Sequence, residues 1–288
     1  MPLAPWSLRC ALPAAAVART VISLTIVNLR KGPTVQSDEQ VSLPSFRDVS
    51  QAEWDRLAGA RVWFGHQSVG GNLLDGIREV IKNDPAARLN IVETDRAAAM
   101  ETPAFGHARI GRNRDPISKI EAFVHLMDAS LGGNVNIAFF KFCYVDIDEN
   151  TDVGALFARY RDAMARLKGK YPGTLFAHVT VPLRAMQTGP KTWAKHLLSR
   201  PVGGEDDNAR RHAFNERLRK EYSGREPLFD LAALEATAPD GQRVLNARGG
   251  LPYYALLSTY TDDGGHLNET GRRRIAEQLL IFLARLAK

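Results

Sequence analysis

The chain has 288 residues, of which 44% are hydrophobic and 24% are charged, and its formal net charge is +6. This length and composition predict a globular protein with a substantial core, built as one large domain or two small ones. The longest basic run, residues 272–274, is typical of a solvated helix face. Because no nucleic-acid-binding motif accompanies the mild positive charge, we expect no nucleic-acid partner. Two cysteines, Cys10 and Cys143, exclude a disulfide framework in the folded part and a cysteine-rich zinc site.

The first residues of the chain carry features of an export signal. Arg9 precedes a short apolar run that ends in residues 16–18, Ala-Val-Ala, which fit a small-x-small cleavage site. This pattern predicts a secreted or periplasmic protein. The alternatives are a disordered extension or a wrongly chosen start codon, either of which would leave a cytoplasmic protein. No uninterrupted run of about 20 apolar residues occurs, so we expect no stable membrane insertion.

Residues 31–44 are polar and rich in turn formers, so we expect 1–44 to be a leader and linker and 45–288 to be the folded domain. In that domain apolar runs predict strands at 61–64, 88–92, 135–144, 174–183 and 227–231. Apolar residues at helical spacing predict helices between them, at 73–81, 116–127, 153–167, 208–222 and 268–286. Two longer irregular segments, 184–207 and 232–262, are candidates for functional loops.

The alternation of strands and helices predicts an α/β fold with a mostly parallel sheet and helices on both faces. In such sheets, ligands bind beyond the carboxyl ends of the strands. Ser68 follows the first predicted strand directly and therefore lies at that edge. On its own, a serine in this place is most often a helix N-cap.

A second motif, Asp263-Gly-Gly-His266-Leu-Asn268, precedes the last predicted helix. It sets an acid and a histidine three residues apart. A serine hydroxyl is a poor nucleophile unless a base lies within hydrogen-bond reach and a partner orients that base. Ser68, His266 and Asp263 can supply those three roles, in the chain order Ser, Asp, His. Asp262 is an alternative orienting acid, and His266 could instead cap or pack against the last helix.

The pattern Gly65-His-Gln-Ser68 after a strand, together with Asp263-x-x-His266-Leu-Asn-x-x-Gly271 before the last helix, resembles the SGNH/GDSL hydrolase superfamily. The resemblance covers the chain from Arg61 to its C-terminus. It implies a three-layer α/β/α sandwich with a flavodoxin-like sheet, and ester hydrolysis or acyl transfer that needs no cofactor and no metal. Ser68 would attack the acyl carbon, His266 would move its proton, and Asp263 would orient the imidazole.

Members of that superfamily usually draw oxyanion-hole donors from the serine amide, a glycine, and the asparagine of a Gly-x-Asn-Asp motif. Here Val145 stands where that asparagine is expected, and Asp146 matches the last residue of the motif. The resemblance therefore points to Ser68, Gly111 and Asn113 as the oxyanion-hole donors.

Two further residues are candidates for contact with substrate. These are Asp146, which could equally brace a loop, and His66, which could equally be structural. Arg109, Arg112 and Arg114 could hold an anionic group, although a solvated loop is the default interpretation.

The predicted function is that of a serine esterase acting on small acyl esters, with O-acetyl groups on carbohydrate as the preferred class. An O-acyltransferase of the same fold and a catalytically weak glycan-binding module are the alternatives. The expected partner is therefore a small-molecule or carbohydrate ester, and the oligomeric state is open. Trp193 and the pair Tyr253-Tyr254 could stack on sugars or be buried in packing.

Overall fold

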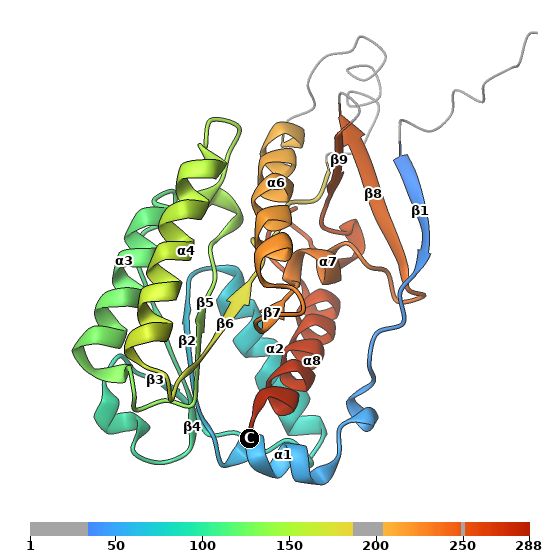
Figure 1. Cartoon of the computed structure of the whole chain (residues 1–288). Helices are drawn as coiled ribbons and strands as arrows, with labels where there is room; N and C mark the ends of the chain where they lie inside the picture. Colours follow the sequence, from blue (N-terminus) through green and yellow to red (C-terminus); the bar gives the residue numbers. More distant parts are fainter. Residues whose placement is uncertain (1–33, 187–203, 249–250) are drawn as a thin grey trace, which may run out of the picture. The chain divides into compact units, whose positions relative to one another are not determined.

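The computed structural model describes residues 34–186, 204–248 and 251–288, and within them six parallel strands form a central sheet (Figure 1). The spatial order of the strands is β3-β4-β2-β5-β6-β7, and every neighbouring pair is parallel. The strands are β2 (Arg61–His66), β3 (Ile91–Glu93), β4 (Ala104–Arg109), β5 (Ile137–Phe140), β6 (Leu175–Val179) and β7 (Leu228–Phe229). The predicted parallel sheet is thus confirmed.

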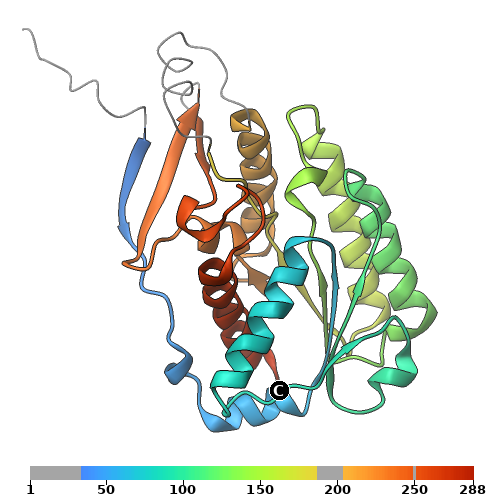
Figure 2. The same ribbon diagram turned by 180° about the vertical axis from the view of Figure 1, so that it is seen from behind.

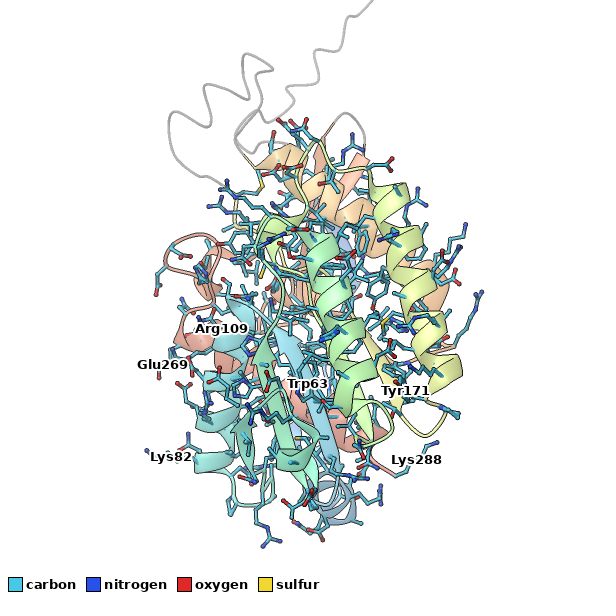
Figure 3. The ribbon with its side chains drawn as sticks, turned by 90° about the vertical axis from the view of Figure 1, so that its left-hand side faces the viewer. Trp63, Lys82, Arg109, Tyr171, Glu269 and Lys288 are labelled. Atoms are coloured by element: carbon cyan, nitrogen blue, oxygen red, sulfur yellow. The ribbon has the colours of Figure 1, made fainter. Side chains whose placement is uncertain are left out.

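Helices cover both faces of this sheet, so the fold is the expected three-layer α/β/α sandwich. One face carries α1 (Gln51–Ala58), α2 (Val69–Asn83) and α8 (Glu269–Leu286), and the other carries α3 (Pro116–Leu126), α4 (Val153–Lys170) and α6 (Glu205–Tyr222). Side chains along β2 alternate between the two cores. Val62 and Phe64 join the core under α2 and α8, whereas Trp63 lies on the other side, 6.0 Å from the ring of Phe123 in α3 (Figure 3).

The helix starts follow from local capping chemistry. At the start of α3, the side chain of Asp115, which precedes Pro116, accepts a hydrogen bond from the backbone amide of Ser118. At the start of α8, the side chain of Asn268 accepts one from the backbone amide of Gly271. The shorter helical elements are η1 (Phe46–Asp48), η2 (Ala97–Met100), the π-helical η3 (Met127–Leu131), η4 (Tyr144–Asp146), α7 (Leu231–Glu235) and η5 (Ser258–Tyr260). None of the described helices is long and apolar enough to cross a membrane.

Strand β4 is absent from the predicted elements. Its sequence, Ala-Phe-Gly-His-Ala-Arg, carries neither an apolar run nor a clean alternation, and its place depends on tertiary packing. Gly106 is needed there because a Cβ atom would lie 2.5 Å from the sulfur of Met100. When either β3 or β4 is left out, the remaining five strands have the 2-1-3-4-5 order of flavodoxin-like sheets, so the sheet carries one additional strand on this side of β2.

A second, antiparallel sheet has the order β1-β8-β9, with β1 (Thr34–Gln40), β8 (Gln242–Arg248) and β9 (Leu251–Tyr254). It lies in segments expected to be linker and irregular loop. Its backbone pairing joins positions far apart in sequence, such as Thr34 with Asn246, which local patterns do not reveal. The predicted leader, residues 1–33, lies outside the described residues, and the boundary at residue 45 remains a prediction.

Candidate active site

Ser68 occupies a strained turn between β2 and α2. Its backbone angles are φ 44° and ψ −109°, although φ is rarely positive in residues other than glycine. Such a conformation costs about 1–3 kcal/mol and is typical of functional sites. Ser68 stands at the N-cap position, yet its side chain makes no capping hydrogen bond. Instead its Oγ atom lies 2.5 Å from Nε2 of His266, so the interpretation of Ser68 as a simple helix cap is wrong.

His266 is oriented by Asp263. The Asp263 Oδ2 atom lies 2.6 Å from Nδ1 of His266, and its Oδ1 atom accepts hydrogen bonds from the backbone amides of Gly265 and His266 at 2.8 and 2.7 Å. Burial opposes ionisation of this carboxyl, but the hydrogen bonds from His266 and Gly265 prevail and hold the pKa of Asp263 well below its usual range. The neighbouring Asp262 accepts a hydrogen bond from Asn268 instead. Asp263 is therefore the acid that contacts the imidazole.

The packing of α2 against α8 explains how residues 198 positions apart meet. Ser68 precedes α2 and His266 lies just before α8, and the two helices pack side by side on one face of the sheet (Figure 2). Gly76 permits the close approach, because a Cβ atom there would collide with the Arg272 carbonyl oxygen and lie 2.8 Å from Cβ of Ala276. The same helix pair therefore sets the separation of the hydroxyl and the imidazole.

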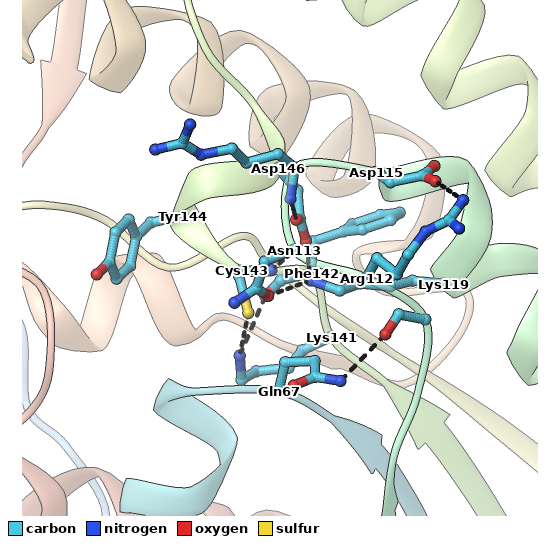
Figure 4. Close-up of polar contacts among 12 residues, drawn as sticks. Gln67, Arg112, Asn113, Asp115, Lys119, Lys141, Phe142, Cys143, Tyr144 and Asp146 are labelled. Atoms are coloured by element: carbon cyan, nitrogen blue, oxygen red, sulfur yellow. Dashed lines mark hydrogen bonds and ion pairs between the residues drawn. The ribbon is translucent and has the colours of Figure 1, made fainter.

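The predicted oxyanion-hole loop lies beside Ser68. Gln67, its chain neighbour, donates hydrogen bonds from Nε2 to the carbonyl oxygens of Ile110 and Gly111 at 3.3 and 3.1 Å (Figure 4). Gly111 has φ +59° and packs against Lys119 so closely that a side chain at residue 111 would clash. The loop conformation thus requires glycine.

Asn113 in this loop is held by Lys119. The Lys119 ammonium donates to Oδ1 of Asn113 at 3.1 Å (Figure 4). Since lysine offers donors only, the amide oxygen faces Lys119 and the Nδ2 group faces away from it. Asn113 itself is exposed, so its Nδ2 hydrogens are available to another acceptor.

Asp146, a predicted substrate contact, is instead buried inside the protein. Its carboxylate forms an ion pair with Lys119, and both side chains have 0% exposure. It also accepts hydrogen bonds from the backbone amides of Cys143 at 2.7 Å and Arg114 at 2.8 Å (Figure 4). With its oxygens occupied and no solvent access, Asp146 ties the backbone of Arg114, next to Asn113, to Lys119 and to the start of η4, and does not reach a substrate.

His66, the other predicted substrate contact, is also buried. Its Nε2 atom lies 3.2 Å from Nδ1 of His107, and a Cβ atom at Gly70 would collide with its ring. Burial, reinforced by the nearby charge of Lys141, lowers the pKa of His66 to about 3. His66 is therefore a neutral packing residue under the start of α2.

Two polar residues close to the site, Tyr144 and Lys141, are absent from the predicted site residues. Tyr144 lies 5.9 Å from the His266 ring, edge to face, and presses against Gly265. Lys141 is fully buried, and its ammonium donates to the Phe142 carbonyl at 3.2 Å. The available signal was a lysine inside the apolar run 135–144, where a charge is costly.

The remaining candidates are distributed as follows. Arg112 pairs with Asp115 at 2.7 Å, whereas Arg109 is exposed at the last position of β4 (Figure 3). Tyr253 is buried, which favours its interpretation as a packing residue, and Trp193 lies outside the described residues. Among the described residues, no group of three or more His, Cys, Asp or Glu side chains could hold a metal ion.

No family model and no curated protein matches the chain, whereas 22 chains of solved structures do. One, from Streptococcus pneumonia and provisionally described as a platelet activating factor, is 16% identical with a TM-score of 0.46, over 81% of this chain and 90% of that one. The acetyl xylan esterase AlAXEase is 16% identical with a TM-score of 0.43, over 76% and 96%.

The periplasmic domain of a lipopolysaccharide acetyltransferase from Salmonella ser. Paratyphi A is 9% identical with a TM-score of 0.39, over 76% of this chain and 81% of that one. Identities and TM-scores of this size do not place the chain in a family.

Proposed function

We propose that the chain is a serine ester hydrolase in which Ser68, His266 and Asp263 form the catalytic triad. One observation carries the proposal: the Ser68 hydroxyl lies 2.5 Å from Nε2 of His266, whose Nδ1 atom lies 2.6 Å from Asp263. A serine that merely capped α2 would direct its hydroxyl to a backbone amide of the helix. The strained backbone of Ser68 supports the same conclusion, because strain persists where function requires a fixed geometry.

In the proposed reaction, Ser68 Oγ attacks the acyl carbon of the ester while His266 Nε2 accepts the hydroxyl proton. Asp263 keeps the Nδ1–H tautomer in place and stabilises the imidazolium that forms. His266 then returns the proton to the leaving alcohol, which departs as the acyl-enzyme forms. A water molecule, activated by the same imidazole, attacks the acyl-enzyme and releases the carboxylic acid.

The tetrahedral intermediates carry a negative oxygen that needs donors. We assign these to the backbone amides of Ser68 and Gly111 and to Nδ2 of Asn113. The orientation of Asn113 by Lys119 and the tether from Gln67 to Gly111 support this assignment. Preorganised donors of this kind lower the barrier because they need no reorientation as charge develops.

The proposed substrates are small acyl esters, with O-acetyl groups on carbohydrate as the preferred class. The side chains of His266 and Asp263 are 45% and 57% exposed, so the triad is open to a bulky alcohol such as a sugar. The same openness supports acyl transfer as the alternative, because a sugar hydroxyl could replace water in the second step. Only the acceptor differs between the two reactions.

The test combines a fluorophosphonate probe with p-nitrophenyl acetate hydrolysis, on the wild-type protein and Ser68→Ala. We expect labelling and turnover in the wild type and the loss of both in Ser68→Ala. The matched control is Ser130→Ala, a part-buried serine of η3 whose hydroxyl donates to the Asp95 carbonyl. Labelling absent from all three proteins would reject the hydrolase and leave the glycan-binding module. Adding a carbohydrate acceptor and assaying its acetylation separates transfer from hydrolysis.

A further inference from the structure

Arg184 follows β6, at the first position of the segment 184–207, which the sequence marks as a candidate functional loop, and its backbone is held on both sides. Its backbone amide donates a hydrogen bond to Oδ1 of Asn208 at 3.1 Å, and its backbone carbonyl accepts one from Nδ2 of Asn208 at 2.8 Å. Leu256 donates to the same carbonyl, and the amide of Ala185 donates to Gly264. The backbone of Arg184 is thus anchored to α6 and to the loop that carries Asp263 and His266.

The Arg184 side chain is exposed and lies beside the proposed triad. Its guanidinium sits 5.5 Å from the centre of the Tyr144 ring, and Tyr144 in turn packs against the His266 ring. A Cβ atom on Gly264 would lie 4.0 Å from Nη2 of Arg184. The guanidinium therefore lies next to the triad loop and rests on an aromatic ring that also contacts the base.

Among the residues that the structure describes, Arg184 has no carboxylate partner, unlike Arg112 and Arg211. Arg112 pairs with Asp115, and the buried Arg211 lies 3.5 Å from Asp207 and donates to the Tyr144 carbonyl. Within the described ranges, no ion pair involves Arg184. Its fork of five N–H donors is presented to solvent at the edge of the site.

We propose that Arg184 is a specificity-determining residue that binds an anionic group, a carboxylate, on the ester substrate. The inference rests on the proposed function and narrows its substrate class to esters that carry a negative charge near the scissile bond. A planar guanidinium matches a carboxylate in two parallel hydrogen bonds, which fixes the orientation of the substrate as well as attracting it. Tyr144 supports this role because it holds the guanidinium against a rigid surface. Arg211 beneath Tyr144 adds positive charge from the side facing the protein interior.

The carboxylate could belong to the leaving alcohol, as in a uronic acid, or to the acyl group, as in a half-ester of a dicarboxylic acid. Two pairs of probes separate these sources. The first pair is 4-acetoxybenzoate and its neutral analogue 4-acetoxybenzamide. The second is phenyl hydrogen glutarate and its neutral methyl ester. Binding to the Ser68→Ala protein is measured by calorimetry at an ionic strength of about 0.15 M, where long-range attraction to the net positive charge is screened.

We expect one anionic probe to bind roughly 10- to 100-fold more tightly than its neutral analogue, the range for hydrogen bonds to a charged group. Arg184→Gln, made in the Ser68→Ala protein, should abolish the preference, and Arg184→Lys should restore part of it. Arg273→Gln removes the charge of an exposed arginine on α8 and should keep the full preference. Equal binding of both members of each pair, or a preference that survives Arg184→Gln, would overturn the inference.

The proposed function fails on a different readout. If wild-type protein shows no Ser68-dependent hydrolysis of phenyl acetate, the hydrolase proposal is rejected while the Arg184-dependent binding ratio stands. If hydrolysis depends on Ser68 but the binding ratio is 1, the anion-binding inference alone is rejected. Far-UV circular dichroism and thermal midpoints of each variant show that the comparison is made between folded proteins.

Discussion

Gly76 in α2 faces the backbone of Arg272 in α8 with no space for a side chain between them. This contact sets the spacing of the two helices, and Ser68 and His266 lie at their starts. Arg272 also pairs with Glu79 across the same interface. The alignment of the proposed nucleophile and base therefore depends on a contact between two residues that have no chemical role.

We predict that Gly76→Ala lowers both stability and activity. The added methyl group collides with backbone, which cannot rotate away, so the helices must separate. Overpacking of this kind costs about 1–3 kcal/mol of unfolding free energy. A displacement of about 1 Å between reacting groups can lower turnover 100-fold. Urea denaturation and p-nitrophenyl acetate kinetics measure the two effects.

Gly169→Ala in α4 is the matched control, because no atom lies within 4 Å of the added Cβ. Replacing an exposed helical glycine by alanine should stabilise the protein by up to about 1 kcal/mol and leave turnover unchanged. If Gly76→Ala behaves like Gly169→Ala, the helix contact does not set the geometry of the site.

Asn113→Ala tests the oxyanion hole. Loss of one such donor lowers kcat by roughly 10²–10³, with little change in KM because the donor acts on the transition state. Asn113 is exposed and its carbonyl oxygen accepts from Lys119, so Asn113→Asp would keep that acceptor and remove the Nδ2 donor. Both variants should lose turnover while their thermal midpoints stay near that of the wild type. Wild-type kinetics in either variant would show that Asn113 is not a donor.

Asp263→Asn and Asp262→Asn form a pair of neighbouring, nearly isosteric changes. In the triad, an amide at residue 263 favours the wrong imidazole tautomer and removes the charge that stabilises the imidazolium, so kcat should fall by about 10⁴. Asp262 contacts Asn268 and not His266, so Asp262→Asn should keep most of the activity. Equal losses in the two variants, measured as kcat for p-nitrophenyl acetate, would contradict the assignment of the acid.

The sequence predicts the parallel sheet, its flanking helices and the meeting of Ser68, Asp263 and His266 because each of these depends on short-range patterns. Those patterns are apolar runs, helical spacing, and a motif directly before a helix cap. The carboxyl ends of parallel strands share one edge, so a serine after the first strand could be assigned to that edge.

Other parts depend on contacts between distant segments. Strand β1 of the antiparallel sheet is mostly polar, and its residues 34–40 pair through backbone groups with residues 242–248 of β8. Asp146 and His66 are polar side chains of the kind that usually mark a site. Their burial follows from Lys119 and His107, which belong to other elements. Arg184 follows a predicted strand, but only the three-dimensional arrangement of the described residues shows that none of their carboxylates pairs with it.

The last prediction concerns the pH dependence of stability, through His66. Burial lowers the pKa of His66 to about 3 in the folded protein, whereas an unfolded chain has the ordinary value near 6.5. Between these values the unfolded state binds a proton that the folded state does not, so stability falls as the pH drops below about 6.5. One such group contributes a slope of up to about 1.4 kcal/mol per pH unit.

His66→Gln cannot titrate, so its unfolding free energy should fall less steeply between pH 6 and pH 4, read by urea denaturation at roughly these values. His125→Gln replaces an exposed histidine on α3 and should keep the wild-type slope. A slope in His66→Gln as steep as that of the wild type would mean that the buried imidazole pair does not resist protonation.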